Sequence, residues 1–283
     1  MRYQITSDST CDLSPQLQAQ YNIRVVPLYI NMGERTLRDG IDVFPDDIYA
    51  HVDAGGALPQ TAAINFADYV RLFTELSAHN DFVIHICISA EFSSCYQNAK
   101  LAAAEFGNVY VVDSRNLSFG HALVVLECAR MAQEGLAPQR IAAALEALTS
   151  RVEASFILDR LEYMKKGGRC SAVTVLGANL LRLRPCIEVQ DGRMQVGKKY
   201  RGSYGACMEA YLRDRLAGRD DLDLRRACVC HSGMPEELVQ KAVQTVQSLQ
   251  PFEELICARA GCTISSHCGP GTMGVLFLRK EGT

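Results

Sequence analysis

The first half of the chain alternates short apolar runs with longer stretches in which apolar residues recur at helical spacing. Phe66, Tyr69, Val70, Phe73 and Leu76 lie three or four positions apart, which predicts an amphipathic helix over Phe66–Ala78. Three further helices are predicted: a short one that begins at Pro15, one over Ser93–Phe106 and one over Phe119–Glu134. The apolar runs that predict strands are Tyr3–Ser7, Val25–Ile30, Phe82–Ser89 and Val109–Val112.

This alternation of strands and helices predicts an α/β fold with a mainly parallel sheet that helices cover on both faces. In such sheets, ligands bind beyond the carboxyl ends of the strands. Three polar segments lie in those places: Asp8-Ser9-Thr10, Ser93-Ser94 and Asp113-Ser114. These segments are therefore candidates for a ligand site.

The pattern changes after a predicted helix around Ile141–Thr149. Asp191-Gly192 separates two alternating runs, which is a strong signal for a β-hairpin formed by Cys186–Gln190 and Met194–Lys198. Other predicted strands are Ser155–Leu158, Ala227–Cys230, Glu254–Ala258 and Val275–Leu278, and other predicted helices are Val173–Leu183, Tyr204–Leu216 and Glu236–Leu249. We therefore predict two domains, an N-terminal α/β domain over residues 1–149 and a C-terminal α+β domain over residues 150–283, with the ligand site between or beside them.

Charge and hydropathy exclude several classes of protein. A net charge of −3 over 283 residues gives no general electrostatic reason to bind nucleic acid. The longest apolar run, Phe82 to Ile88, is too short to span a bilayer, so we expect no stable membrane insertion. The first residues lack the apolar core of a signal peptide, and we expect a cytoplasmic protein.

The twelve cysteines are numerous for such a chain. In a reducing cytosol they are expected to be free thiols, and most are expected to be small buried residues. No C-x-x-C occurs, and Cys228-Val229-Cys230-His231 does not have the spacing of a zinc site. We therefore predict no metal site.

Two glycine-containing stretches resemble nucleotide-binding motifs, but the elements predicted around them do not fit a nucleotide site. Gly269, Gly271 and Gly274 form a formal G-x-G-x-x-G, but an apolar run that predicts a final strand follows them instead of a helix. Gly192–Lys199 nearly matches a Walker A loop, yet it ends in Lys where the motif needs Ser or Thr. Its pattern also predicts the second strand of a hairpin instead of a loop that leads into a helix. We expect the C-terminal glycines to allow close passage of the backbone, with His267 held beside them.

A hydrolase is an alternative hypothesis for the function of this chain. The chain has serines, histidines and aspartates but no G-x-S-x-G elbow. A nucleophile at Ser93, or a thiol enzyme that uses Cys11, Cys95 or Cys268 with His267, stays open as an alternative.

A set of small hydroxyls and cations is the more promising constellation. Thr61 lies in a loop after Pro59-Gln60, and Ser93 lies at a predicted helix start, where its hydroxyl can cap the helix. Lys165-Lys166-Gly167-Gly168-Arg169 places cations beside a flexible turn, and Arg201 follows the hairpin. Hydroxyls, an Arg and a His around one point suit a single carboxylate or phosphate.

At these residues the chain resembles the DegV family, the bacterial fatty-acid-binding proteins that serve as the lipid-carrying subunit of fatty acid kinase. The resemblance runs essentially from end to end, and the order and spacing of its motifs are more specific than any single motif. The matching segments are Asp8–Leu13, Pro59-Gln60-Thr61, Phe92–Ala99, Val112-Asp113-Ser114 with Ser118 and Gly120, Leu161–Arg169, Arg184-Pro185 and His267–Gly271.

The resemblance implies a non-catalytic lipid-binding protein that holds one long-chain fatty acid in an apolar tunnel and has no intrinsic cofactor. Thr61 and Ser93 match the family's carboxylate-binding hydroxyls, and His267 matches its histidine near the head group. Arg169 and Arg201 match basic residues linked to the head group or to the encounter with the kinase. A separate ATP-binding kinase subunit would phosphorylate the carboxylate to an acyl phosphate for phospholipid synthesis.

Three hypotheses follow from these observations. The first is a fatty acid carrier for a kinase, the second is an independent Ser or Cys hydrolase, and the third is a lipid-sensing interaction protein. The end-to-end order of the motifs favours the first.

Overall fold

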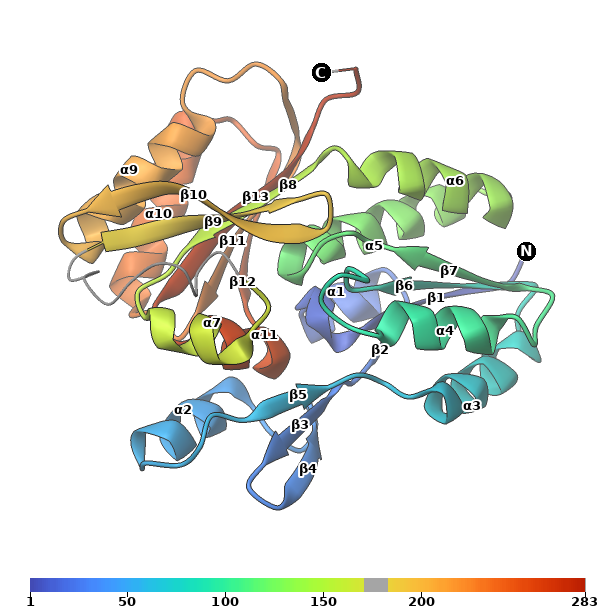
Figure 1. Ribbon diagram of the computed structural model, residues 1–283. Helices are drawn as coiled ribbons and strands as arrows, with labels where there is room; N and C mark the ends of the chain where they lie inside the picture. Colours follow the sequence, from blue (N-terminus) through green and yellow to red (C-terminus); the bar gives the residue numbers. More distant parts are fainter. Residues whose placement is uncertain (171–182, 283) are drawn as a thin grey trace.

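The computed structural model describes residues 1–170 and 183–282, and its strands form three sheets (Figure 1). The first sheet has four parallel strands in the order β2-β1-β6-β7. They are β1 (Tyr3–Asp8), β2 (Ile23–Val26), β6 (Phe82–Cys87) and β7 (Val109–Asp113). Every residue of β6 is buried, as expected for an inner strand of a sheet covered on both faces. The predicted α/β fold with a parallel sheet is confirmed.

The second sheet has six strands in the order β10-β9-β8-β13-β11-β12. They are β8 (Val152–Ile157), β9 (Leu183–Gln190), β10 (Arg193–Arg201), β11 (Leu222–Ser232), β12 (Glu254–Arg259) and β13 (Thr272–Arg279). All neighbours are antiparallel except β11 and β12. The predicted hairpin is confirmed, because β9 and β10 are joined at Asp191 and Gly192, both with positive φ. The stretch that resembles a Walker A loop is therefore a strand.

One helix, α5 (Ser118–Gln133), is buried along almost its whole length and contacts strands of both large sheets (Figure 1). On the four-stranded sheet, α6 (Pro138–Thr149) joins α5, while α3 (Phe66–Ser77) and α4 (Cys95–Ala103) also pack against its strands. On the six-stranded sheet, α9 (Tyr204–Leu216) and α10 (Glu236–Leu249) pack against its strands. Within residues 1–170 and 183–282, the other helices are α1 (Pro15–Gln20), α2 (Pro45–Asp53), α7 (Leu161–Gly167) and α11 (Cys262–Cys268), with a 3-10 turn over Ser9–Cys11.

The third sheet was not predicted. The single predicted strand Val25–Ile30 is wrong, because β2 ends at Val26 and a new strand, β3 (Tyr29–Met32), begins in another sheet. Pro27 separates them, and its missing N–H cannot continue a ladder. β3 pairs with β4 (Arg35–Arg38) and β5 (Gln60–Ala62), which places Thr61 opposite Ile30.

The helices of the structure differ from the predicted ones in two places. The helices α7 and α11 lie in segments for which the sequence predicted no helix. The predicted helix Val173–Leu183 lies outside the described residues except for Leu183, which begins β9. Among the helices that the structure describes, none is long and apolar enough to cross a membrane.

Candidate functional site

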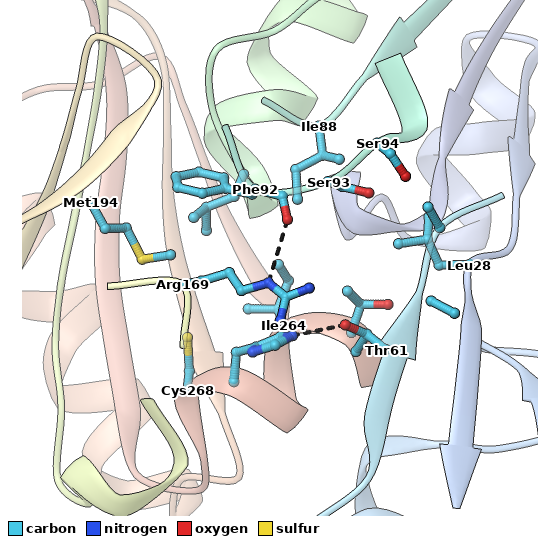
Figure 2. A pocket seen from close by; sticks show the side chains of 15 residues that line it. Leu28, Thr61, Ile88, Phe92, Ser93, Ser94, Arg169, Met194, Ile264 and Cys268 are labelled. Carbon is cyan, nitrogen blue, oxygen red and sulfur yellow. Dashed lines mark hydrogen bonds between the residues drawn. The ribbon is translucent and has the colours of Figure 1, made fainter. Parts of the chain in front are cut away.

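A cavity of about 120 Å³ lies among segments that are far apart in the sequence (Figure 2). Its walls come from β5, the loop after β6, the second residue after α7, β10 and α11, among other segments. Thr61, Ser93, Arg169 and His267 all line this cavity. Arg201, the last residue of β10, is exposed and is not among the lining residues. The fold thus brings together four of the five residues that the sequence singled out.

Thr61 and His267 form a direct pair across the cavity. Thr61 lies on β5 and His267 lies on α11, and 2.9 Å separates Thr61 Oγ1 from His267 Nε2. Burial, together with the neighbouring Arg169 guanidinium, lowers the pKa of His267 to about 4. The imidazole is therefore neutral near pH 7 and carries one N–H.

The surroundings of the ring indicate which nitrogen carries this proton. His267 Nδ1 is buried and has no hydrogen-bond partner among the described residues. A buried donor without a partner is costly, so we assign the proton to Nε2, which donates to Thr61 Oγ1. The hydroxyl hydrogen of Thr61 is then free to donate to a ligand in the cavity.

Gly167, the last residue of α7, explains why His267 Nδ1 is so enclosed. A Cβ at position 167 would lie 2.3 Å from Nδ1. The helix then ends at Gly168, whose φ of 66° is left-handed. The glycine pair therefore allows α7 to pack directly on the imidazole and turns the chain so that Arg169 follows at the cavity.

Ser93 lies in the loop after β6 and keeps a weakly held hydroxyl. Its Oγ accepts from Cys95 N at 3.2 Å and donates to Cys95 Sγ at 3.2 Å. Because sulfur is a weak acceptor, this hydroxyl can turn to a better acceptor at small cost. The predicted helix start at Ser93 is wrong by two residues, since α4 begins at Cys95.

Arg169 supplies a cation at the cavity. Its guanidinium donates to two backbone carbonyls, Gly167 O at 3.0 Å and Phe92 O at 3.5 Å. Among the residues that the structure describes, no carboxylate pairs with it. Figure 2 shows its guanidinium directed between the segment that carries Ser93 and the strand that carries Thr61. The site therefore combines hydroxyl donors with an unneutralised positive charge, which suits an anionic group.

The rest of the wall is mainly apolar, and a further cavity continues it inward. A second, smaller cavity of about 30 Å³ shares Leu117, Ile264 and Cys268 with the first. These three side chains are buried, whereas Thr61, Ser93 and His267 are half-buried and Arg169 is exposed. The site thus has a polar mouth and an apolar interior.

Sequence reasoning missed the contribution of α11 to this wall. Thr263, Ile264, His267 and Cys268 line the first cavity, and their spacing places them on one face of a helix. This spacing was visible in the sequence, but the segment has only seven residues and glycines flank it. Such a short periodic stretch does not stand out from loop sequence.

The C-terminal glycines serve packing. Gly269 ends α11 with φ of 73°, and a Cβ there would lie 2.6 Å from the ring of Tyr163 on α7. A side chain at this position would separate α7 from α11. The predicted role of these glycines in close backbone passage therefore agrees with the contacts that they make.

The three thiols that the sequence offered as nucleophiles are not activated. Burial raises the pKa of Cys11, Cys95 and Cys268 to about 12 in each case. Reactive cysteines have lowered pKa values, because the thiolate is the nucleophile. This counts against a thiol hydrolase. Within residues 1–170 and 183–282, no group of three His, Cys, Asp or Glu side chains is arranged to hold a metal ion.

Comparisons with known proteins place this site in context. The family model described as "Uncharacterised protein, DegV family" matches residues 2–280. A DegV domain-containing protein of Caldanaerobacter subterraneus is 30% identical over 278 residues, which cover 98% of each chain.

Solved structures agree with this match. A DegV family protein from Thermus thermophilus, described by its fatty acid binding, has a TM-score of 0.90 and 33% identity and covers 99% of this chain and 100% of its own. A stearic-acid-binding protein from Eubacterium ventriosum has a TM-score of 0.84 and 25% identity, with 98% of both chains covered.

Proposed function

Since the chain belongs to the DegV family, we propose that it binds one long-chain fatty acid between two domains, residues 1–149 and 150–283. Thr61, Ser93 and His267 hold the carboxylate, and the acyl chain lies in the apolar interior. The observation that carries this proposal is the convergence of these three residues and Arg169 at the mouth of one cavity whose interior is apolar. Fatty acid binding by the Thermus and Eubacterium structures supports it.

The mouth of the cavity is suited to a carboxylate because hydrogen-bond donors surround it. The hydroxyls of Thr61 and Ser93 donate to the two oxygens, and His267 holds the Thr61 hydroxyl in place through the 2.9 Å contact. Arg169 offsets the negative charge, which would be costly to bury without a partner. These contacts fix the orientation of the ligand at the mouth.

Affinity comes mainly from the tail. Burial of a methylene contributes about 0.8 kcal/mol, so ~15 methylenes contribute roughly 12 kcal/mol before the cost of ordering. The two cavities measure about 120 and 30 Å³, while small-molecule sites typically measure about 300–1,000 Å³. An acyl chain that runs from the first cavity into the second therefore separates the shared walls at Leu117, Ile264 and Cys268.

The proposal extends to a reaction that a partner performs. A separate kinase subunit brings ATP and metal, and a carboxylate oxygen of the bound fatty acid attacks the terminal phosphorus of ATP. An acyl phosphate forms and ADP leaves. Arg201, exposed at the end of β10, is then a contact for the kinase, and this role rests on the resemblance of the motifs.

Removal of either hydroxyl tests the head-group assignment. We expect Thr61→Ala and Ser93→Ala each to weaken stearic acid binding by roughly tenfold or more, since a hydrogen bond to a charged group contributes about 1.5–3 kcal/mol. Native mass spectrometry of lipid retention and thermal unfolding measure binding and stability separately. Thr36→Ala, which removes an exposed hydroxyl from β4 of the same small sheet, is the control. Unchanged retention in both variants would refute the assignment.

The kinase-facing role has its own test. We expect Arg201→Ala to reduce acyl phosphate production by a fatty acid kinase subunit more than it reduces fatty acid binding, because Arg201 lies outside the cavity. Product formation at saturating fatty acid is compared with lipid retention. Equal losses in both assays argue against the role. Fatty acid binding without support of a kinase would favour the alternative of a lipid-sensing interaction protein.

A further inference from the structure

The helix α11 is too short to hold its own position. It has seven residues, yet it supplies Thr263, Ile264, His267 and Cys268 to the cavity wall. An isolated helix of this length is unstable in water, so its placement depends on contacts with the rest of the protein.

Two carboxyl groups from the N-terminal half bind the first backbone N–H groups of this helix. Gly261 N donates to Asp12 Oδ1 at 2.8 Å. Cys262 N donates to Asp39 Oδ1 at 2.9 Å, and Thr263 N donates to Asp39 Oδ2 at 3.1 Å. Both carboxyl groups are buried, and burial raises the pKa of Asp12 to about 8, so that Asp12 accepts from Gly261 N mainly as a neutral acid near pH 7. They therefore satisfy donors that a helix start would otherwise leave without partners.

Asp39 makes the larger set of contacts. Thr263 Oγ1 also donates to its Oδ2 at 2.7 Å, and Ser9 Oγ donates to the same oxygen at 3.0 Å. Its own backbone N donates to Leu28 O at 2.9 Å. Both side-chain oxygens thus accept from fixed donors, and three of these four donors belong to α11.

The position of Asp39 in the chain links this anchor to the ligand site. Asp39 directly follows β4, and β4 belongs to the same three-stranded sheet as β5, which carries Thr61. Figure 1 shows this small sheet directly below α11. The small sheet therefore carries the hydroxyl that meets His267, and the residue directly after its strand β4 carries the carboxylate that anchors the helix of His267.

We infer that Asp39, assisted by Asp12, is a positioning residue that fixes α11 on the small sheet so that His267 Nε2 meets Thr61 Oγ1. The inference rests on the proposed fatty acid site. Asp39 does not line the cavity and acts on the carboxylate only through His267.

A double-mutant cycle separates positioning from a general structural role. In Asp39→Asn, one side-chain oxygen becomes an NH₂ group that faces donors, so the hydrogen bonds that this oxygen accepts from α11 are lost. We expect Asp39→Asn to weaken stearic acid binding by about tenfold in the wild-type background. In the His267→Ala background the same change is expected to cost less than about twofold, because the imidazole that Asp39 positions is absent. Calorimetric titration of delipidated protein with stearic acid measures all four affinities.

A matched control and a replacement variant distinguish loss of positioning from loss of folding. Asp46→Asn removes another carboxylate that joins the two halves, through Arg259, without touching α11, and we expect unchanged binding. If Asp39→Asn does not fold, Asp12→Ala, which removes the acceptor of Gly261 N, takes its place in the cycle. Equal losses in both backgrounds, or no loss at all, would overturn the inference.

A readout without ligand covers the case in which the wild type does not bind stearic acid and the proposed function fails. The imidazole NMR signals of His267, assigned by their loss in His267→Ala, report its hydrogen bond to Thr61. We expect Asp39→Asn to shift these signals and Asp46→Asn to leave them unchanged. Unshifted signals in Asp39→Asn would show that Asp39 does not position His267.

Discussion

Ile264→Trp is expected to abolish fatty acid binding while the protein stays folded. Ile264 is buried, and it belongs to the walls of both cavities. An indole at this position occupies the passage that we propose for the acyl chain, and it would remove most of the burial from which affinity is expected to arise. Overpacking costs about 1–3 kcal/mol of stability in a filled core, but here the cavity receives part of the added volume.

The composition of the chain makes this experiment direct. The sequence contains no Trp, so the introduced indole is the only one, and its emission reports whether it is buried. Leu101→Trp, at a 63% exposed position on α4, is the matched control and is expected to retain binding. Stearic acid titration measures the loss. Normal binding by an Ile264→Trp protein with buried emission would mean that the acyl chain takes another path.

Local sequence signals predicted the large elements well. The alternation of apolar runs and amphipathic stretches predicted the parallel sheet and its helices, and Asp191-Gly192 predicted the hairpin of β9 and β10. The break at Pro27 was missed because apolar residues continue on both sides of it, from Val26 to Leu28. A change of sheet depends on long-range pairing, which the local pattern does not contain.

The site was predictable by residue type but not by arrangement. Hydroxyls, an Arg and a His at motif positions indicated an anion site, yet 206 positions separate Thr61 from His267. Their contact depends on the placement of α11, whose start donates hydrogen bonds to the buried side chains of Asp12 and Asp39. The apolar walls, such as Ile264 and Met194, were not identified because an apolar residue in a core and one in a ligand cavity look alike in sequence.

Gly167→Ala is expected to weaken fatty acid binding without lowering the stability of the protein. The added Cβ would lie 2.3 Å from His267 Nδ1 and 3.3 Å from its Cγ, so the imidazole must move and its contact with Thr61 is lost. Gly167 is helical and its φ is not positive, so alanine fits the backbone and gains about 0.5–1 kcal/mol in a helix. We therefore expect fatty acid affinity to fall by about tenfold or more while the melting temperature holds or rises.

The neighbouring glycine provides the opposite case. Gly168 has φ of 66°, and a Cβ there meets nothing within 4 Å. Gly168→Ala is expected to cost about 1–2 kcal/mol of stability through backbone strain and to leave His267 and binding in place. Adding Gly167→Ala to His267→Ala is expected to cause no further loss of affinity, because the clash needs the imidazole. Lost binding in Gly168→Ala with retained binding in Gly167→Ala would mean that the turn before Arg169, and not the contact between His267 and Thr61, controls the head group.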